Sequence, residues 1–229
     1  MFIICYAELP KDDKAVLPSP MEILRPSESD MYNAIRRLSQ LLDNAEIIAY
    51  PTETFYGLGT RYDSEDSLER LYNIKKRPHE KAMPLIIGRA ELLSLLTPVI
   101  PEVAEKLMKR FWPGPLTLIL EAQENLSLHI TAGTGKVAVR IPGQSFGLDL
   151  ARHLDYPITA TSANITGMAP AMTADEVIAC FGSAAITIVD SGKTPGNTPS
   201  TIVDVTGSEI KIVRQGMIPQ REIFAAVYR

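Results

Sequence analysis

The sequence predicts an α/β fold in which helices pack around a twisted sheet that mixes parallel and antiparallel strands. Segments with helical spacing of apolar residues alternate along the chain with short runs of aliphatic and β-branched residues, which is typical of layered α/β proteins. The last strand-like runs follow one another closely, so part of the sheet is expected to be antiparallel. With 45% hydrophobic and 22% charged residues, the 229-residue chain can bury a substantial core.

The first half of the chain begins with a proline-rich stretch and continues with alternating elements. Residues 7–27 carry four prolines and little apolar periodicity, which predicts an extended segment, preceded by a candidate strand at 1–6. The elements expected next are a helix at 31–42, a strand at 46–50 ended by Pro51, a helix at 64–76 closed by Pro78, a strand at 84–87, and helices at 90–96 and 102–111.

The second half repeats this alternation and ends in clustered strands. The expected elements are strands at 116–120 and 137–141, a helix at 145–154, a strand at 158–161, a helix at 174–181, strands at 186–190, 201–205 and 209–213, and a helix at 220–228. The Gly/Pro-rich stretch 191–199 is interpreted as a loop. A single domain over 1–229 is therefore predicted, with its motifs in a core of about 31–216 and with 1–30 as an extended N-terminal segment.

Composition excludes several classes of protein. Lys and Arg number 23 against 27 Asp and Glu, a net charge of −4, which argues against a surface that binds nucleic acid everywhere. Two cysteines cannot build a disulfide framework, and the three histidines stand at no metal-motif spacing, so no dedicated zinc site is predicted. No apolar run is long enough for a membrane span and no targeting signal is recognisable. We therefore expect a cytoplasmic protein without a membrane partner.

Familiar catalytic and nucleotide-binding motifs are missing. The sequence has no G-x-G-x-x-G and no G-x-S-x-G. Gly133-Thr134-Gly135-Lys136 has neither the upstream glycine nor the following Ser/Thr of a P-loop, and a turn before the next strand explains it better.

Polar clusters stand instead at the ends of the predicted strands, where open α/β sheets place their ligands. The first is the run from Pro51 to Gly59, whose Thr52 and Thr54 hydroxyls suit a small polar ligand, although a capped turn is an equally good interpretation. The second contains Lys75, Arg77 and Lys81, three cations suited to a polyphosphate. Favourable pairing with a helix C-terminus explains Lys75 but not the other two.

Two further clusters complete the candidate site. One strand ends in the run from Thr159 to Asn164, small hydroxyls and an amide that would let a nucleotide approach the backbone. Arg140 interrupts an apolar strand, and Arg214 ends another strand just before a glycine. An arginine in an apolar run either lies at a sheet edge or points into a polar cavity, and the two together favour a shared site.

These pieces, in this order, resemble the YrdC-like threonylcarbamoyl-AMP synthase family in its short, single-domain form. The matching pieces are PTETFYGLG from Pro51, the K-x-R-P of Lys75–Pro78, FWPGPLT from Phe111, VAVRIP from Val137, the S-x-N of Ser162–Asn164, STIVDV from Ser200 and VRQG from Val213. The strand after K-x-R-P has no His, whereas many members carry one near the threonine.

The resemblance implies a concave basic cavity and the formation of threonylcarbamoyl-AMP and pyrophosphate from L-threonine, bicarbonate or CO2, and ATP. It implies Mg²⁺ held mainly by the ATP phosphates, and downstream proteins that transfer the threonylcarbamoyl group to tRNA. The site residues it implies are Lys75, Arg77, Ser162 and Asn164 for catalysis, Arg77, Lys81, Ser162, Asn164 and Arg214 for ATP, and Thr52, Thr54, Arg140 and Ser200 for threonine.

Three alternatives stay open on the sequence. The same basic cavity would suit the backbone of double-stranded RNA, and such a module would bind RNA directly. A related carbamoyl transfer in hydrogenase maturation also uses a YrdC-like domain, together with zinc-finger and acylphosphatase regions that this sequence lacks. Finally, Arg140 would serve the fold alone if it formed an internal ion pair with Asp204 or Glu53.

Overall fold

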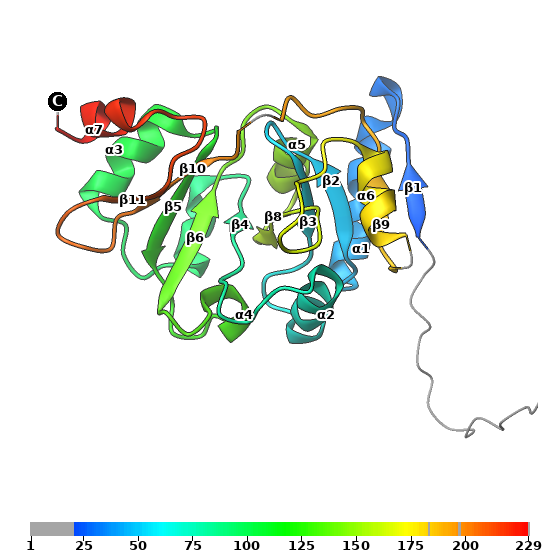
Figure 1. The fold of residues 1–229 in the computed structure, drawn as a ribbon, viewed down its shortest axis with the longest axis horizontal. Coiled ribbons are helices and arrows are strands. Elements are labelled where there is room, and N and C mark those ends of the chain that lie inside the picture. The colour runs from blue at the N-terminus through cyan, green and yellow to red at the C-terminus, as the bar shows by residue number, and fades with distance from the viewer. Residues whose placement is uncertain (1–20, 183, 197, 229) are drawn as a thin grey trace, which may run out of the picture.

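The structure is a computed structural model that describes residues 21–182, 184–196 and 198–228, and Figure 1 traces its fold. The candidate strand at 1–6 and most of the proline-rich stretch lie outside these residues. In chain order the elements are β1 (Glu22–Leu24), η1 (Glu28–Asp30), α1 (Met31–Asp43), β2 (Ile48–Pro51), β3 (Tyr56–Gly59), α2 (Glu65–Lys75), β4 (Leu85–Ile86), η2 (Ala90–Leu95), α3 (Glu102–Phe111), β5 (Leu116–Glu121), α4 (Leu128–Thr131), β6 (Lys136–Arg140), α5 (Phe146–His153), β7 (Ile158–Thr159), β8 (Thr161–Ser162), α6 (Ala174–Phe181), β9 (Thr187–Val189), β10 (Thr201–Asp204), β11 (Lys211–Arg214) and α7 (Gln220–Tyr228).

The strands form two mixed sheets, which confirms the mixed α/β class. One sheet has the order β1-β9-β2-β3-β8, with parallel pairing up to β2 and antiparallel pairing beyond it. The other has the order β11-β10-β5-β6-β4-β7 and alternates antiparallel with parallel pairs. Helices flank both sheets: α3 packs against α7 at one end of the molecule, and α1 packs against α5 and β2 at the other (Figure 1).

A single continuous sheet was expected, and the division into two occurs at one short segment. The predicted strand at 158–161 is split: β7 pairs with β4 in the second sheet, and β8 pairs with β3 in the first. Ala160 stands between them and donates its amide to the carbonyl of Pro84. The Thr159 amide also reaches the Thr60 carbonyl at 2.9 Å, so the two sheets stay joined along this segment.

Strand β3 was not among the predicted elements, because residues 51–59 were interpreted either as a run that holds a small polar ligand or as a capped turn. Gly57 and Gly59 have low intrinsic strand propensity, and they conceal the strand. Their role is to make room for Tyr50, because a Cβ on Gly59 would stand 2.6 Å from the Tyr50 ring. The buried Tyr50 hydroxyl donates to the Thr159 carbonyl at 2.9 Å and so ties the β2–β3 hairpin to β7.

Other differences from the expected elements are small. α3, α6 and α7 have the predicted bounds, and most strands differ by one or two residues. β1 forms where only an extended segment was expected, because β9 supplies a parallel partner from far along the chain. The four-residue α4 was not anticipated. Within the described residues, no helix has both the length and the apolar character that crossing a membrane requires.

Two clusters of buried side chains hold the layers together. The larger joins both sheets and includes Leu58, Leu85, Leu118 and Ile188. The smaller lies beneath α1 and α5 and includes Leu38, Leu42, Tyr50 and Leu150. Because both sheets are anchored in the larger cluster, the strand ends between them are held in a fixed relation.

Candidate active site

A cavity of about 660 Å³ lies where the two sheets meet. It is bordered by the β2–β3 turn, by β8, and by β5, β6, β10 and β11. The predicted site residues that line it are Thr52, Thr54, Arg77, Arg140, Ser162, Ser200 and Arg214. Lys75, Lys81 and Asn164 are not among the lining residues. The fold thus gathers clusters that lie up to 162 positions apart (214 − 52) into one place.

The turn between β2 and β3 is held by its own threonine. Thr52 Oγ1 accepts from the amides of Thr54 and Phe55 at 3.2 and 3.3 Å, and it donates to the Phe55 carbonyl at 2.7 Å. The Thr54 hydroxyl lies 3.0 Å from that of Thr52. The Thr52 hydroxyl therefore donates its proton within the turn. Thr52 and Thr54 both line the cavity.

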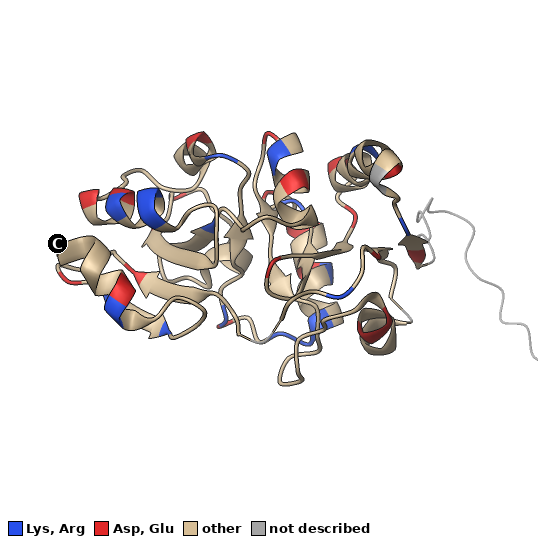
Figure 2. Cartoon of the chain, turned by 90° about the horizontal axis from the view of Figure 1, so that it is seen from above, with Lys and Arg blue, Asp and Glu red and all other residues tan. Residues whose placement is uncertain are grey.

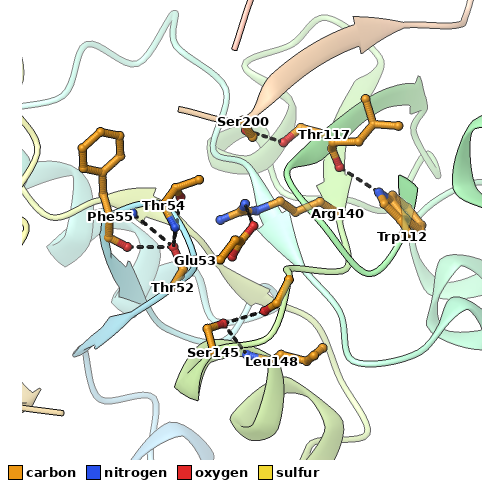
Figure 3. Close-up of polar contacts among 12 residues, drawn as sticks. Thr52, Glu53, Thr54, Phe55, Trp112, Thr117, Arg140, Ser145, Leu148 and Ser200 are labelled. Atoms are coloured by element: carbon orange, nitrogen blue, oxygen red, sulfur yellow. Dashed lines mark hydrogen bonds and ion pairs between the residues drawn. The ribbon is translucent and has the colours of Figure 1, made fainter. Parts of the chain in front are cut away.

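Arg140 forms an ion pair with Glu53 at the centre of the site (Figure 3). Their Nη1 and Oε1 atoms are 2.5 Å apart, and both side chains are largely buried. This is one of the internal pairs weighed above, whereas Asp204 pairs with Lys136. Among the described residues, no group donates to the second, buried Glu53 oxygen, Oε2. A buried carboxylate oxygen without a partner is costly, and Glu53 itself is not among the residues that line the cavity.

Arg214 is fixed at the opposite wall by Ser200. Its Nε and Nη2 donate to the Ser200 carbonyl at 3.1 and 2.9 Å, and Nη2 also reaches Ser200 Oγ at 3.0 Å. The Ser200 hydroxyl in turn lies 2.9 Å from that of Thr117 (Figure 3). Burial lowers the pKa of Arg214, and the charge of Arg140 lowers it further. The guanidinium groups of Arg140 and Arg214 therefore both border the cavity and are close enough to interact electrostatically.

Arg77 is fixed by the backbone of the segment that follows it. Its Nε donates to the Lys81 carbonyl at 2.9 Å and its Nη2 to the Ala82 carbonyl at 2.6 Å. A guanidinium has five N–H groups, so the others remain for a ligand. Lys81 contributes its carbonyl here, while its side chain is exposed outside the cavity lining.

The S-x-N turn has a defined polarity. Ser162 Oγ donates to Asn164 Oδ1 at 2.6 Å, and Asn164 Nδ2 donates to the carbonyls of Ile165 and Met168. Because those two carbonyls fix the orientation of the amide, the Ser162 proton is committed to Asn164. Towards the cavity, Ser162 therefore presents lone pairs and acts as an acceptor.

Lys75 lies behind this turn rather than in the cavity. It is 1% exposed, and its Nζ donates to the carbonyls of Ser162 and Asn164, the latter at 2.8 Å. Burial lowers the pKa of Lys75 to about 7, with a further lowering from Arg77. We infer that Lys75 and Asn164 position Ser162.

The resulting surface suits an anionic ligand. Three arginines border the cavity, and none of the described residues that line it is acidic. Hydroxyls stand on both walls, and the Glu53 carboxylate lies behind Arg140. The site can therefore hold anions.

Two polar groups of the site escaped the sequence interpretation. Glu53 was considered only as a partner of Arg140, although it stands between Thr52 and Thr54 in a run already singled out. Thr117 lies within an apolar strand at 4% exposure, and it was quoted only as the last residue of the FWPGPLT piece, with no role in the site. A hydroxyl on a fully buried strand face was the available hint.

Comparisons with known proteins show the family of this chain. The family model described as "Telomere recombination", for Sua5, YciO and YrdC proteins, matches residues 40–216. A threonylcarbamoyl-AMP synthase from Pyrococcus abyssi is 38% identical over 189 residues, which are 82% of this chain and 56% of that protein. Another from Idiomarina loihiensis is 37% identical over 169 residues, covering 72% of this chain and 89% of the relative.

A solved structure extends the likeness to three dimensions. The crystal structure of Pyrococcus abyssi Sua5 in complex with L-threonine superposes with a TM-score of 0.85 at 35% identity, covering 92% of this chain and 61% of that one. The chain thus spans little more than half the length of the relative from Pyrococcus abyssi, and the same holds for a relative from Bacillus subtilis.

Proposed function

Because the chain belongs to the Sua5/YciO/YrdC family, we propose that it is an L-threonylcarbamoyladenylate synthase, a nucleotidyltransferase that uses ATP. The observation that carries the proposal is the meeting of Arg77, Arg140 and Arg214 with the Thr52–Thr54 turn in one cavity. The names of the relatives support the same activity.

In this proposal ATP lies along Arg77, Ser162 and Arg214. The free N–H groups of the two arginines donate to phosphate oxygens, and their backbone anchors hold them in place before ATP arrives. Ser162, as an acceptor, suits a ribose hydroxyl, the adenine amino group or a water on Mg²⁺ rather than a bare phosphate oxygen. With no acidic residue in the described lining, Mg²⁺ would be held mainly by phosphates and water.

Threonine, in the same proposal, binds between Arg140 and the β2–β3 turn. The substrate carboxylate takes the guanidinium N–H groups that Glu53 leaves unused, and the Thr54 and Ser200 hydroxyls contribute further hydrogen bonds. Glu53 Oε2 is buried and has no partner, so a small shift of the Glu53 side chain on binding would let it accept from the positively charged substrate amine.

The chemistry then needs positioning rather than a protein nucleophile. The substrate ammonium first loses one proton to water and becomes a neutral amine. Its lone pair then forms an N–C bond with CO2 while one C=O electron pair moves onto oxygen, and a second N–H proton leaves to water, which yields a carbamate. A carbamate oxygen attacks the α-phosphorus of ATP, the bond to the bridging oxygen breaks, and pyrophosphate leaves with the electron pair. Fixed arginines near the phosphates stabilise the charge that develops, and binding in one cavity brings the two anions together.

The wider setting follows from this reaction. The product is consumed by proteins that transfer the threonylcarbamoyl group to tRNA, so we place the protein in the cytoplasm. We also propose that these residues work within a single domain. A role as a double-stranded RNA-binding module is not favoured, because the arginines border a bounded cavity while acidic and basic segments are interspersed over the helices (Figure 2).

Pyrophosphate release tests the proposal directly. The purified chain is incubated with Mg²⁺-ATP, L-threonine and bicarbonate, and pyrophosphate and labelled threonylcarbamoyl-AMP are followed together. We expect product only when all three substrates are present. Equal pyrophosphate release without threonine would show a different reaction, and no release from folded protein that binds ATP would remove the synthase assignment.

A further inference from the structure

A second polar cluster lies among residues that do not line the cavity. Among the described residues, Glu69 of α2, His79 of the segment after α2, and His129 of α4 bring one ligand atom each within 4.8 Å of one another. The two histidines are 50 positions apart (129 − 79), so their sequence spacing predicts no metal site. The fold brings them together.

His129 stands between two carboxylates in a way that a neutral ring cannot satisfy. Its Nε2 lies 2.7 Å from Glu69 Oε2, and its Nδ1 lies 3.0 Å from Glu65 Oε2. A neutral imidazole has one N–H, so only one of these contacts can be a hydrogen bond. With the proton on Nδ1 and donated to Glu65, the Nε2 lone pair faces a carboxylate oxygen. A second proton fits between these two atoms as they stand, and a metal ion would fit after the 2.7 Å contact opens.

The buried side chain of Tyr72 contacts the chain segments on either side of the cluster. The Tyr72 side chain is 1% exposed, and its hydroxyl lies 2.7 Å from the carbonyl oxygens of both Lys81 and His129. The His79 ring stacks on Tyr72 with centroids 5.0 Å apart and an interplanar angle of 5°. His79 and His129 ring centroids are 5.7 Å apart. Tyr72 thus fixes the segments that carry both histidines.

We propose that Glu69, His79 and His129 form a binding site for a divalent transition metal of the Zn²⁺ class, with water as the fourth ligand. Two imidazoles and one carboxylate favour Zn²⁺ over Mg²⁺ or Ca²⁺, which prefer oxygen ligands. Ligand atoms around tetrahedral Zn²⁺ are about 3.3 Å apart, given bonds of about 2.0–2.1 Å. The site therefore requires rotations of these side chains, which are at least partly exposed, and an opening of the 2.7 Å Glu69–His129 contact.

Glu65 lies where it would orient His129 as a metal ligand. A carboxylate that accepts the remaining N–H of a metal-bound histidine fixes the tautomer and orients the ring. The Glu65 contact at Nδ1 has this arrangement, with Ser127 Oγ at 3.3 Å from the same nitrogen. A bound ion would link α2, the segment that carries Arg77, and α4. Since the ion binds the folded state, it would also stabilise that state.

Metal binding by the full chain, free of any histidine tag, tests the site independently of the proposed reaction. Zn²⁺ titration by calorimetry and against a chromophoric chelator should give one ion per chain, with no competition from excess Mg²⁺. Co²⁺ should give the intense visible absorption of a four-coordinate site. Added Zn²⁺ should raise the thermal unfolding midpoint.

Variants separate this site from incidental binding. His79→Ala and His129→Ala should each lower Zn²⁺ affinity at least tenfold, and Glu65→Gln should lower it about 10–100-fold by releasing the ring. His153→Ala is the matched control, since His153 lies on α5 beside Tyr32 and outside the cluster. Affinity unchanged in a folded His79→Ala/His129→Ala double variant, or lowered equally by His153→Ala, would overturn the proposal. Absence of one-to-one binding by the unaltered chain would do the same.

Discussion

Lys75 provides a quantitative test of how the S-x-N turn is built. Its amine is buried and donates to the carbonyls of Ser162 and Asn164. Burial lowers its pKa from the ordinary 10.5 to about 7. Between these two pH values the unfolded chain holds one proton more than the folded protein, so the free energy of unfolding must rise with pH.

The size of the effect follows from the pKa difference. Below pH 7 both the folded and the unfolded state hold the proton, so Lys75 does not make the free energy of unfolding depend on pH. Above pH 7 the free energy of unfolding rises by up to about 1.4 kcal/mol per pH unit, which corresponds to a difference of one bound proton. With a folded pKa of about 7, the rise between pH 7 and pH 9 amounts to about 2 kcal/mol. The neutral amine keeps its hydrogen bonds to both carbonyls, so deprotonation leaves the turn intact.

The assay compares two variants with the unaltered chain. Lys75→Met has a similar length and no titrating group, and Lys76→Met replaces the exposed neighbour. Urea unfolding, followed by the fluorescence of the single tryptophan, Trp112, gives the free energy of unfolding at pH 6, 7, 8 and 9. The difference in the free energy of unfolding between the unaltered chain and a variant removes the pH dependence that the other titrating groups contribute to both.

We expect the stability difference between the unaltered chain and Lys75→Met to grow by about 2 kcal/mol from pH 7 to pH 9 and to stay constant from pH 6 to below pH 7. The difference from Lys76→Met should not change with pH. A Lys75→Met difference that is the same at pH 7 and pH 9 would show that the folded protein keeps the Lys75 proton, and the reasoning from burial would be wrong.

The remaining predictions concern the cavity. Arg140→Lys should raise the KM for threonine at least tenfold and leave the KM for ATP nearly unchanged, because an ammonium keeps the charge opposite Glu53 but lacks the planar fork that suits a second carboxylate. Steady-state kinetics and thermal unfolding of the variant measure this. A variant that loses stability but keeps normal threonine dependence would show that Arg140 serves only the fold. Arg77→Ala and Arg214→Ala should each weaken ATP binding by about tenfold to a hundredfold, for a loss of about 1.5–3 kcal/mol per charge-assisted contact. Calorimetry measures this with Arg110→Ala, an exposed arginine on α3, as the control; unchanged affinity in the folded Arg77→Ala/Arg214→Ala double variant would place ATP elsewhere.

The sequence by itself determined the features that depend on neighbouring residues. The bounds of α3, α6 and α7 follow from apolar spacing, because a helix buries one face at a period that a short window reveals. The Thr52–Thr54 turn was also visible, since a threonine that bonds the amides two and three residues on is a local event. Motif order added the family, because several short pieces in one order are far more specific than any one of them.

Only the tertiary structure decided what the distant residues do for one another. Lys75, expected beside a phosphate, is a buried support for Ser162, because α2 packs behind the S-x-N turn. Arg140 meets Glu53 across the junction of the two sheets, a contact that required β3, the strand hidden by Gly57 and Gly59. Tyr72 contacts both His79 and His129, which come from distant parts of the chain. Each of these contacts depends on which strands pair and which faces of the helices and sheets are buried. Those pairings join residues far apart in the sequence, so no short stretch of sequence reveals them.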